Sequence, residues 1–194
     1  MKLLREYIRE LLTESYFPLA GGDKLRIHHS RPGTRIEDDV EGSGSFPQDS
    51  NFTQKIGNKP NGLWYECQDG SSQNWKDFCD AGGLSGGSAK YDRSYNVVLN
   101  DYEILFIPDE YYFEKFYKMY SVPHPADTDG KKGYDKQIDW PRVAKDYAGI
   151  EICPYLDSKR HDDDSFWYYG WDVASGCVWG SEGIKELIRQ GECK

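Results

Sequence analysis

Hydrophobic and polar positions follow a helical period at the start of the chain. The first fourteen residues, MKLLREYIRELLTE, place apolar side chains on one helical face, at Leu3, Leu4, Tyr7, Ile8, Leu11 and Leu12. Charged side chains cover the other face, and a Ser/Pro/Gly-containing stretch follows. The pattern predicts an amphipathic helix over 1–14, a linker over 15–23 and a single domain over 24–194. An ordinary N-terminal helix packed on that domain is the alternative.

The remaining pattern mixes strand and helix periods. Alternating or short apolar runs predict strands over 24–30, 62–67, 91–100, 102–107 and 149–153, and two more within 166–179. Helical spacing and capping residues predict helices over 32–40, 72–80, 108–120, 140–147 and 182–190. Such a mixture with hairpins predicts an α+β fold with mixed, mainly antiparallel sheets and flanking helices.

Turn-forming residues separate these elements. Gly-, Ser-, Pro- and Asp-rich stretches predict loops over 41–61, 82–88, 121–137 and 156–164. Asp139 is the expected N-cap of the 140–147 helix, with Pro141 in its first turn. Either Ser71 or Ser72 is the expected cap of the 72–80 helix.

Size and charge restrict the classes of function. The 194 residues suit one domain, and 24 basic against 33 acidic residues give a net charge of −9. This acidity argues against bulk binding of nucleic acid or of an anionic membrane. No apolar run approaches the roughly 20 residues that span a bilayer, so no membrane partner is expected.

Cysteines and aromatic residues refine this picture. The five cysteines are odd in number and form no C-x-x-C pair, which predicts reduced thiols. No Cys/His cluster has ligand spacing, so no metal is expected. Aromatic residues make up 15% of the chain, which predicts a core of rings whose polar edges need hydrogen-bond partners.

The N-terminal pattern resembles the capsid-targeting peptides of large tailed phages. In that family a charged helix docks a protein on the scaffold inside the immature head, and the head protease then cuts after a glutamate. Leu12-Thr13-Glu14 followed by Ser15 matches that cleavage pattern. The resemblance implies a bacteriophage protein that is carried inside the virion and then reaches the cytoplasm of the bacterial host.

The body carries four short motifs that together resemble those of a family of bacterial and phage proteins. They are Ile27-His28-His29-Ser30, Lys59-Pro60-Asn61-Gly62-Leu63-Trp64-Tyr65, Trp75-Lys76-Asp77-Phe78-Cys79 and Gly170-Trp171-Asp172-Val173-Ala174-Ser175-Gly176-Cys177-Val178-Trp179. Their order resembles the ADP-ribosyltransferase fold, in which an early strand ends in His-x-Ser, a Gly-x-aromatic strand follows and a late strand supplies an acid. The resemblance implies NAD as substrate.

The resemblance also implies roles for individual residues. His28 hydrogen-bonds the ribose next to the nicotinamide, Ser30 supports the pocket, and Gly62 lets the chain approach the nicotinamide amide. Trp64 or Tyr65 stacks on the nicotinamide ring. Leu63 and Ser175 complete the expected cofactor-binding set, which comprises Ser30, Gly62, Leu63, Trp64, Tyr65 and Ser175.

The acidic residue is where this chain departs from the resemblance. Breaking the glycosidic bond of NAD generates an oxocarbenium-like sugar, which a carboxylate can stabilise. The family's Glu-x-Glu or Gln-x-Glu string is absent near 149–173, so Asp172 and Glu151 are the two candidates. Asp172 could equally form a hairpin-capping turn, and His28 could be a buried structural histidine. Neighbouring residues on a strand face opposite sides, so the sequence leaves open which of His28 and His29 faces the cleft.

The sequence therefore predicts an ADP-ribosyltransferase that modifies a host protein or a small molecule during host takeover. A non-catalytic binding or inhibitor module that uses the same aromatic cleft is the main alternative, and an internal structural protein of the virion is the third. The first two hypotheses require His28, Trp64 and Asp172 to line a common pocket.

Overall fold

The described chain forms an α+β domain around a curled, mainly antiparallel sheet. The computed structural model describes residues 17–20, 24–30, 52–68, 70, 73–83, 91, 93–124 and 136–190. In that part of the chain the main sheet contains, in spatial order, β10 (Ile184–Arg189), β4 (Arg93–Leu99), β1 (Leu25–Ser30), β3 (Leu63–Gln68), β9 (Ser175–Val178), β8 (Gly149–Ile152) and β5 (Ile104–Ile107). The coarse fold class expected from the sequence is confirmed.

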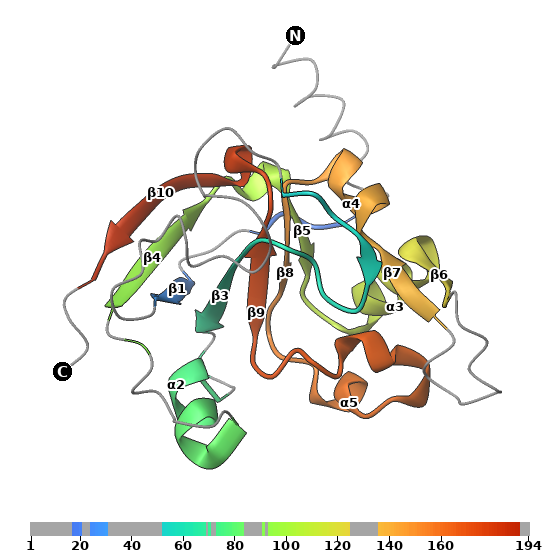
Figure 1. Ribbon diagram of the computed structural model, residues 1–194, viewed down its shortest axis with the longest axis horizontal. Helices are drawn as coiled ribbons and strands as arrows, with labels where there is room; N and C mark the ends of the chain where they lie inside the picture. The colour runs from blue at the N-terminus through green and yellow to red at the C-terminus, as the bar shows by residue number, and fades with distance from the viewer. Residues whose placement is uncertain are drawn as a thin grey trace, which may run out of the picture.

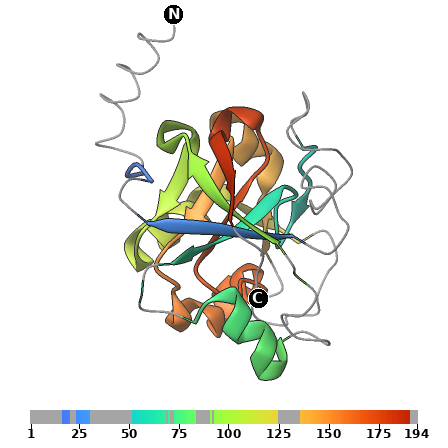
Figure 2. The same cartoon turned by 90° about the vertical axis from the view of Figure 1, so that its left-hand side faces the viewer.

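The strand pairs explain the order of the elements. β5 and β8 are parallel, and the other neighbouring pairs of the main sheet are antiparallel. Parallel strands need a long crossover, and here it contains α3 (Glu110–Tyr120), β6 (Ser121–Pro123), β7 (Lys136–Asp139) and α4 (Trp140–Asp146). Figure 2 shows β1 crossing the view while β10 runs upright, so the sheet is strongly curled.

The smaller elements lie at two places around the sheet. β6 and β7 form a second sheet with β2 (Ile56–Gly57), in the order β2-β7-β6, beside α3 and α4 (Figure 1). The short helices α2 (Trp75–Phe78) and α5 (Asp157–Arg160) lie at the end of the main sheet where β3 ends and β9 begins (Figure 1). That end of the sheet holds the candidate site.

Short polar side chains begin the helices. Asp139 accepts a hydrogen bond from the backbone N–H of Arg142 at 3.1 Å, which confirms its predicted capping role. Asp109 caps α3 in the same way. The cap of α2 is Asn74, which accepts from the N–H of Asp77 at 2.8 Å, so the serine cap expected from the sequence is wrong.

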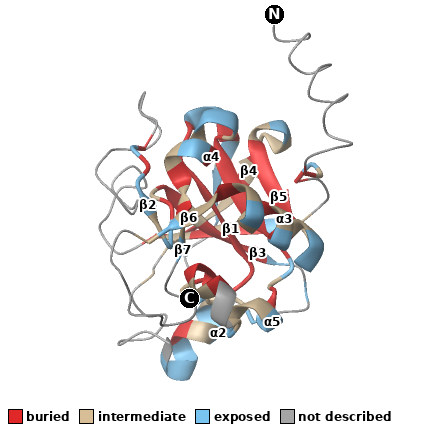
Figure 3. Cartoon of the chain, turned by 90° about the vertical axis from the view of Figure 1, so that its right-hand side faces the viewer, coloured by how far each residue is buried: buried red, intermediate tan, exposed pale blue. Residues whose placement is uncertain are grey.

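The core is built from stacked aromatic rings, as the composition predicts. Phe113 of α3 stacks on Trp167, with ring centroids 5.2 Å apart. Trp140 and Trp179 are fully buried and donate their indole N–H groups to the carbonyls of Gly57 and Tyr147. Figure 3 shows the buried strands of the sheet surrounded by exposed helical surface. Ring packing therefore makes up much of the core, although the buried indole N–H groups of Trp167 and Trp171 have no hydrogen-bond partner among the described residues.

The C-terminal element corrects the sequence prediction. The helix expected over 182–190 is a 3-10 turn, η6 (Ser181–Gly183), followed by strand β10, which pairs antiparallel with β4. Ile184, Leu187 and Ile188 have helical spacing, but β4 offers an unpaired edge, and pairing with it satisfies the backbone of both strands. Helical propensity is a weak preference that such tertiary pairing overrides.

Four further predictions, one strand and three loops, are wrong in their details. The first of the two strands expected within 166–179 is replaced by a 3-10 segment, η5 (Asp163–Tyr168), and an irregular stretch that buries Trp167, Tyr168 and Trp171. The loop expected over 156–164 contains α5. The loops expected over 41–61 and 121–137 contribute β2, β6 and the start of β7. β2, β6 and β7 form because they pair with one another, although the stretches that contain them are locally polar.

A disulfide joins Cys67 to Cys153, so the expectation of reduced thiols is wrong for this pair. The two residues are 86 positions apart in sequence, with Cα atoms 6.3 Å apart. Glu66 and Ile152 both pair with Ser175, the first residue of β9. Cys67 and Cys153 each lie one residue beyond those pairs and so meet across the end of β9. This approach depends on the strand order and has no local signal.

The remaining sequence predictions fall on residues outside the described part. They are the leader over 1–14, the cleavage site Glu14–Ser15, the helix over 32–40 and most of the loop over 82–88. Of the linker expected over 15–23, residues 17–20 are described, and Phe17 and Ala20 are buried in the core.

Candidate functional site

A cavity forms where β1 and β3 diverge. The ladder between these strands covers the pairs Leu25↔Gln68, Arg26↔Cys67 and Ile27↔Glu66. This ladder ends at Ile27, whereas β1 pairs with β4 along its other edge from Ile27 to Ser30. The opening holds a cavity of about 150 Å³, lined by Ile27, His28, His29, Lys59, Gly62, Trp64, Tyr65, Glu66, Trp75, Tyr91, Trp171, Asp172, Val173 and Ser175.

The cavity brings together many of the residues expected from the sequence. Its lining includes His28, Gly62, Trp64, Tyr65, Asp172 and Ser175. These residues come from β1, from β3 and its approach, and from the segment leading into β9, which are distant in sequence. The convergence required of His28, Trp64 and Asp172 is therefore observed.

Other candidates lie elsewhere. Ser30 and Leu63 are fully buried and are not part of the cavity lining. Glu151 lies behind the cavity, in the buried network described below. Glu14 and Ser15 belong to the part of the chain that the structure does not describe.

The two adjacent histidines both line the cavity, through different contacts. His28 is buried, and its Nδ1 lies 2.7 Å from the carbonyl oxygen of Trp64. At Trp64 the strands β1 and β3 have separated, so the imidazole of His28, and not the backbone of β1, contacts this carbonyl oxygen. His29 Nε2 lies 3.0 Å from Oε1 of Glu66. The sequence left open which histidine faces the cleft, and the structure assigns both to its lining.

Two indole rings form the apolar wall. The rings of Trp64 and Trp171 meet edge to face, with centroids 4.8 Å apart. Nζ of Lys59 lies 4.8 Å from the centroid of Trp64, a cation–π contact. Gly62 packs so tightly that a Cβ there would lie 2.4 Å from the carbonyl oxygen of Val178. Glycine is therefore required at this position for β3 to enter beside β9.

Asp172 faces positive charge on the same side of the cavity. Its Oδ1 lies 3.0 Å from an η-nitrogen of Arg160, and both side chains are partly exposed. Burial raises the pKa of Asp172, and the attraction of Lys59 and Arg160 only partly opposes this effect. The carboxylate is thus held in an ion pair at the edge of the cavity.

Glu66 is a second carboxylate of the lining, and the sequence analysis missed it. Burial raises the pKa of Glu66, but the hydrogen bonds from His29 and from the backbone N–H of Trp75 outweigh burial and lower the pKa below its ordinary value. Strand alternation was the available signal, since residue i+2 from Trp64 shares its face. Trp171, Lys59, Trp75 and Tyr91 were missed as lining residues as well.

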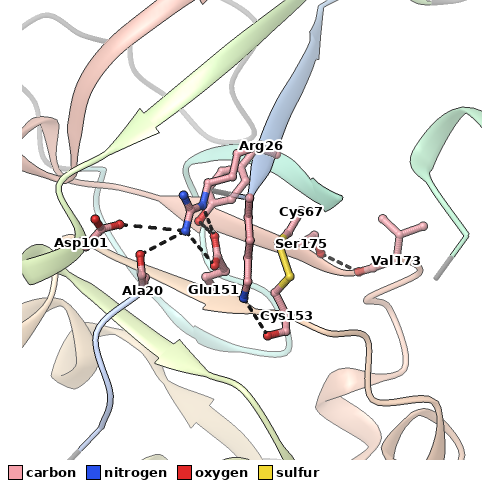
Figure 4. The surroundings of a disulfide bond; sticks show 10 residues. Ala20, Arg26, Cys67, Asp101, Glu151, Cys153, Val173 and Ser175 are labelled. Atoms are coloured by element: carbon pink, nitrogen blue, oxygen red, sulfur yellow. Dashed lines mark hydrogen bonds and ion pairs between the residues drawn. A yellow bond between two sulfur atoms is a disulfide. The ribbon is translucent and has the colours of Figure 1, made fainter. Parts of the chain in front are cut away.

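The structure does not bring Glu151 into the cavity. Figure 4 shows its carboxylate facing Arg26, whose Nε and an η-nitrogen donate to it at 2.5 and 3.1 Å. The hydroxyl of Tyr65 donates to the same carboxylate at 3.0 Å. Burial raises the pKa of Tyr65 well above its ordinary value. Burial lowers the pKa of Arg26, but pairing with Glu151 outweighs it and leaves the pKa raised. Glu151 is therefore part of a buried ion pair, and Asp172 is the one acidic candidate that reaches the cavity.

One group among the described residues has the spacing of a metal site. Its members are Cys67, Glu151 and Cys153, whose ligand atoms lie within 4.8 Å of one another. The two sulfur atoms are bonded to each other, and Glu151 accepts from Arg26 and Tyr65. A metal would need thiolate sulfurs, so this arrangement does not fit one.

Comparisons with protein-family models, with curated proteins and with solved structures gave no match to this chain. Among the described residues, no helix is both long enough and apolar enough to cross a bilayer.

Proposed function

We propose that this chain is an ADP-ribosyltransferase that binds NAD⁺ in the cavity between β1 and β3 and breaks the bond between nicotinamide and ribose. The observation that carries the proposal is the convergence of His28, Trp64 and Asp172 on one cavity. The cavity volume is about 150 Å³. An apolar cavity of about 150 Å³ can hold benzene, so the nicotinamide ring fits and the rest of the dinucleotide extends outward.

The lining supplies the groups that this chemistry needs. Trp64 and Trp171 provide an aromatic wall for the ring and exclude water from the reacting carbon. His28 provides an imidazole next to the strand opening, where it can bind a ribose hydroxyl. Asp172 provides a carboxylate that can stabilise positive charge on the sugar. Lys59 and Arg160 lie beside Asp172, where they can meet the phosphates of the ligand.

The delivery route is part of the same proposal and rests on the sequence alone. Residues 1–14 would target the protein to the scaffold of a phage head, and the head protease would cut between Glu14 and Ser15. The mature protein would enter the host cytoplasm with the genome and modify a host protein or a small molecule. N-terminal mass spectrometry of the protein recovered from virions tests this step, because cleavage predicts a mature chain beginning at Ser15.

Nicotinamide release tests the chemistry. The full chain is incubated with NAD⁺ and host lysate, and free nicotinamide is followed by NMR. His28→Ala should reduce release by at least about tenfold, since His28 lies in the cavity. His161→Ala is the matched control, because His161 is an exposed histidine outside the cavity. If His28→Ala and wild type release equal amounts of nicotinamide, and thermal melting shows that both proteins are folded, the role assigned to His28 is rejected.

The alternative is a non-catalytic module that holds a nucleotide-like ligand or a host protein. One observation favours it: Glu151 is sealed in a buried ion pair, and Asp172 is engaged by Arg160. If calorimetry shows that the protein binds NAD⁺ and the NMR assay shows no release of nicotinamide, the result supports a binding module. Capture of host proteins by the wild type, and not by Trp64→Ala, would then identify its target.

A further inference from the structure

We propose that Glu66 makes this cavity selective for charge, so that it binds a positively charged N-alkylated pyridinium ring in preference to its neutral counterpart. The inference rests on the proposed function in one respect, the kind of ring that is bound, because the nicotinamide ring of NAD⁺ is a positively charged pyridinium. It assigns Glu66 as a specificity-determining residue.

The two carboxylates of the lining differ in their compensating charge. Asp172 is paired with Arg160 at 3.0 Å and also faces Lys59. Glu66 is buried, with 4% of its surface exposed. Among the described side chains, its ion-pairing partner within 4.0 Å is His29, which carries a positive charge only when protonated, whereas Asp172 faces a guanidinium and an ammonium group. Glu66 is therefore the carboxylate whose negative charge a bound cation can compensate.

Hydrogen bonds fix Glu66 in its charged form. Oε1 accepts from His29 and from the side-chain amide of Gln68, each at 3.0 Å. Oε2 accepts from the backbone N–H of Trp75 at 2.5 Å. Because a carboxylate has about four acceptor positions, capacity remains for a ligand or for direct charge–charge contact. Since these bonds hold the pKa of Glu66 below its ordinary value, the group is ionised at neutral pH.

Aromatic rings surround the same end of the cavity. The ring of Tyr91 lies 6.1 Å from that of His29 and 6.3 Å from that of Trp75. Trp64 lies two residues before Glu66 on β3, about 7 Å away along the strand, and also lines the cavity. Aromatic faces attract cations, so the rings and Glu66 act in the same direction on a flat cationic ring.

A matched pair of small ligands separates charge from shape. The full chain is titrated with 1-methylnicotinamide, which is cationic, and with nicotinamide, which is neutral, and binding is followed by calorimetry and tryptophan fluorescence. We expect wild type to bind the cation at least about tenfold more tightly, which corresponds to about 1.4 kcal/mol. Glu66→Gln should reduce this ratio below about threefold, because glutamine keeps the size and loses the charge. Glu186→Gln is the matched control and should leave the ratio unchanged, because Glu186 is an exposed glutamate of β10 outside the cavity lining.

Each outcome decides the matter. A wild-type ratio near one, or no binding of either ligand up to about 10 mM, overturns the inference, as does an unchanged ratio in folded Glu66→Gln. The wild-type ratio tests the inference even if Glu66→Gln fails to fold. Selective binding without nicotinamide release from NAD⁺ would leave the inference standing and reject the transferase. Release of nicotinamide from NAD⁺, together with an unchanged ratio in Glu66→Gln, would support the transferase and reject the role assigned to Glu66.

Discussion

Two buried carboxylates, Glu66 and Glu151, lie on opposite sides of the same sheet and have different surroundings. Glu151 is fully buried, and a guanidinium and a phenol hydroxyl bind it. Glu66 is almost as buried, but an imidazole, an amide and a backbone N–H bind it beside a cavity. Burial of an acid therefore does not by itself identify a functional group. The charge of its partners and access to open space distinguish the two.

Alternation along β3 creates this difference. Trp64, Tyr65 and Glu66 all border the cavity, but the hydroxyl of Tyr65 reaches past β9 and donates to Glu151 at 3.0 Å. That reach requires Gly176, since a Cβ there would lie 2.2 Å from the Tyr65 hydroxyl oxygen. The cavity side of β3 provides the ligand-facing groups, and the Tyr65 side links β1, β3 and β8.

The largest effect should come from breaking the buried pair. Arg26→Met leaves Glu151 without its cation, and we expect it to lower the free energy of unfolding by about 3–5 kcal/mol. Denaturant-induced unfolding at neutral pH measures the loss. The double variant Arg26→Met/Glu151→Gln removes both charges and should recover much of it. A loss under about 1 kcal/mol in the single variant would show that Glu151 depends on its cation less than its buried contacts indicate.

The next effect concerns the disulfide on the Tyr65 side. Replacing Cys67 and Cys153 together by alanine removes a link that closes a long segment of chain, with 86 residues of sequence separation. We expect a loss of about 2–4 kcal/mol in the free energy of unfolding, chiefly because the unfolded chain gains freedom. Non-reducing peptide mapping of the wild type is the accompanying control. If the wild type shows free thiols at both positions, the disulfide does not form in the purified protein.

A smaller effect should reveal the opposite pKa shifts of the two cavity carboxylates. The folded-state pKa of Glu66 is lowered from 4.5, so its ionised form stabilises the fold above that pH, and this contribution is lost as pH falls. We expect Glu66→Gln to be about 1–2 kcal/mol less stable than wild type at pH 7, with the difference shrinking toward pH 3. Thermal and denaturant unfolding across this range measure it.

Asp172→Asn is the matched control for that experiment. The folded-state pKa of Asp172 is raised from 3.8, so its protonated form favours folding and this contribution is lost as pH rises. The variant should be as stable as wild type, or more stable, at pH 7. Equal losses in Glu66→Gln and Asp172→Asn would contradict the difference in environment described for the two carboxylates.

The smallest effect concerns Lys59. Its ammonium lies over Trp64 and lowers the pKa of Asp172 by electrostatic attraction, against the larger effect of burial. Lys59→Met should therefore raise the pKa of Asp172 further, as followed by NMR titration of its carboxyl carbon. The stability should change by less than about 1 kcal/mol, because Lys59 is exposed. A lowered pKa of Asp172 would reject the assigned contact.

Much of the site could be predicted from the sequence because its motifs lie on strands with a clear hydrophobic pattern. The apolar runs around Ile27 and Leu63 predict β1 and β3, and their adjacent polar and aromatic residues supplied His28, Gly62 and Trp64. Glu66 was missed because the motif ended at Tyr65, and the sequence could not decide which of His28 and His29 faces the cleft. Glu151 was misplaced because burial on a late strand cannot be distinguished from exposure to a cavity without knowing the strand order.

Local chemistry in the sequence determined the α+β class, the cap at Asp139 and the aromatic core, because these depend on nearby residues and on periodicity. Only the tertiary structure decided that 184–189 forms a strand, that Cys67 meets Cys153, and that β1 leaves β3 after Ile27. Those features depend on contacts between residues that are far apart in the chain. Their free energies arise from pairing and burial in the assembled sheet, and neither is encoded in a local window of sequence.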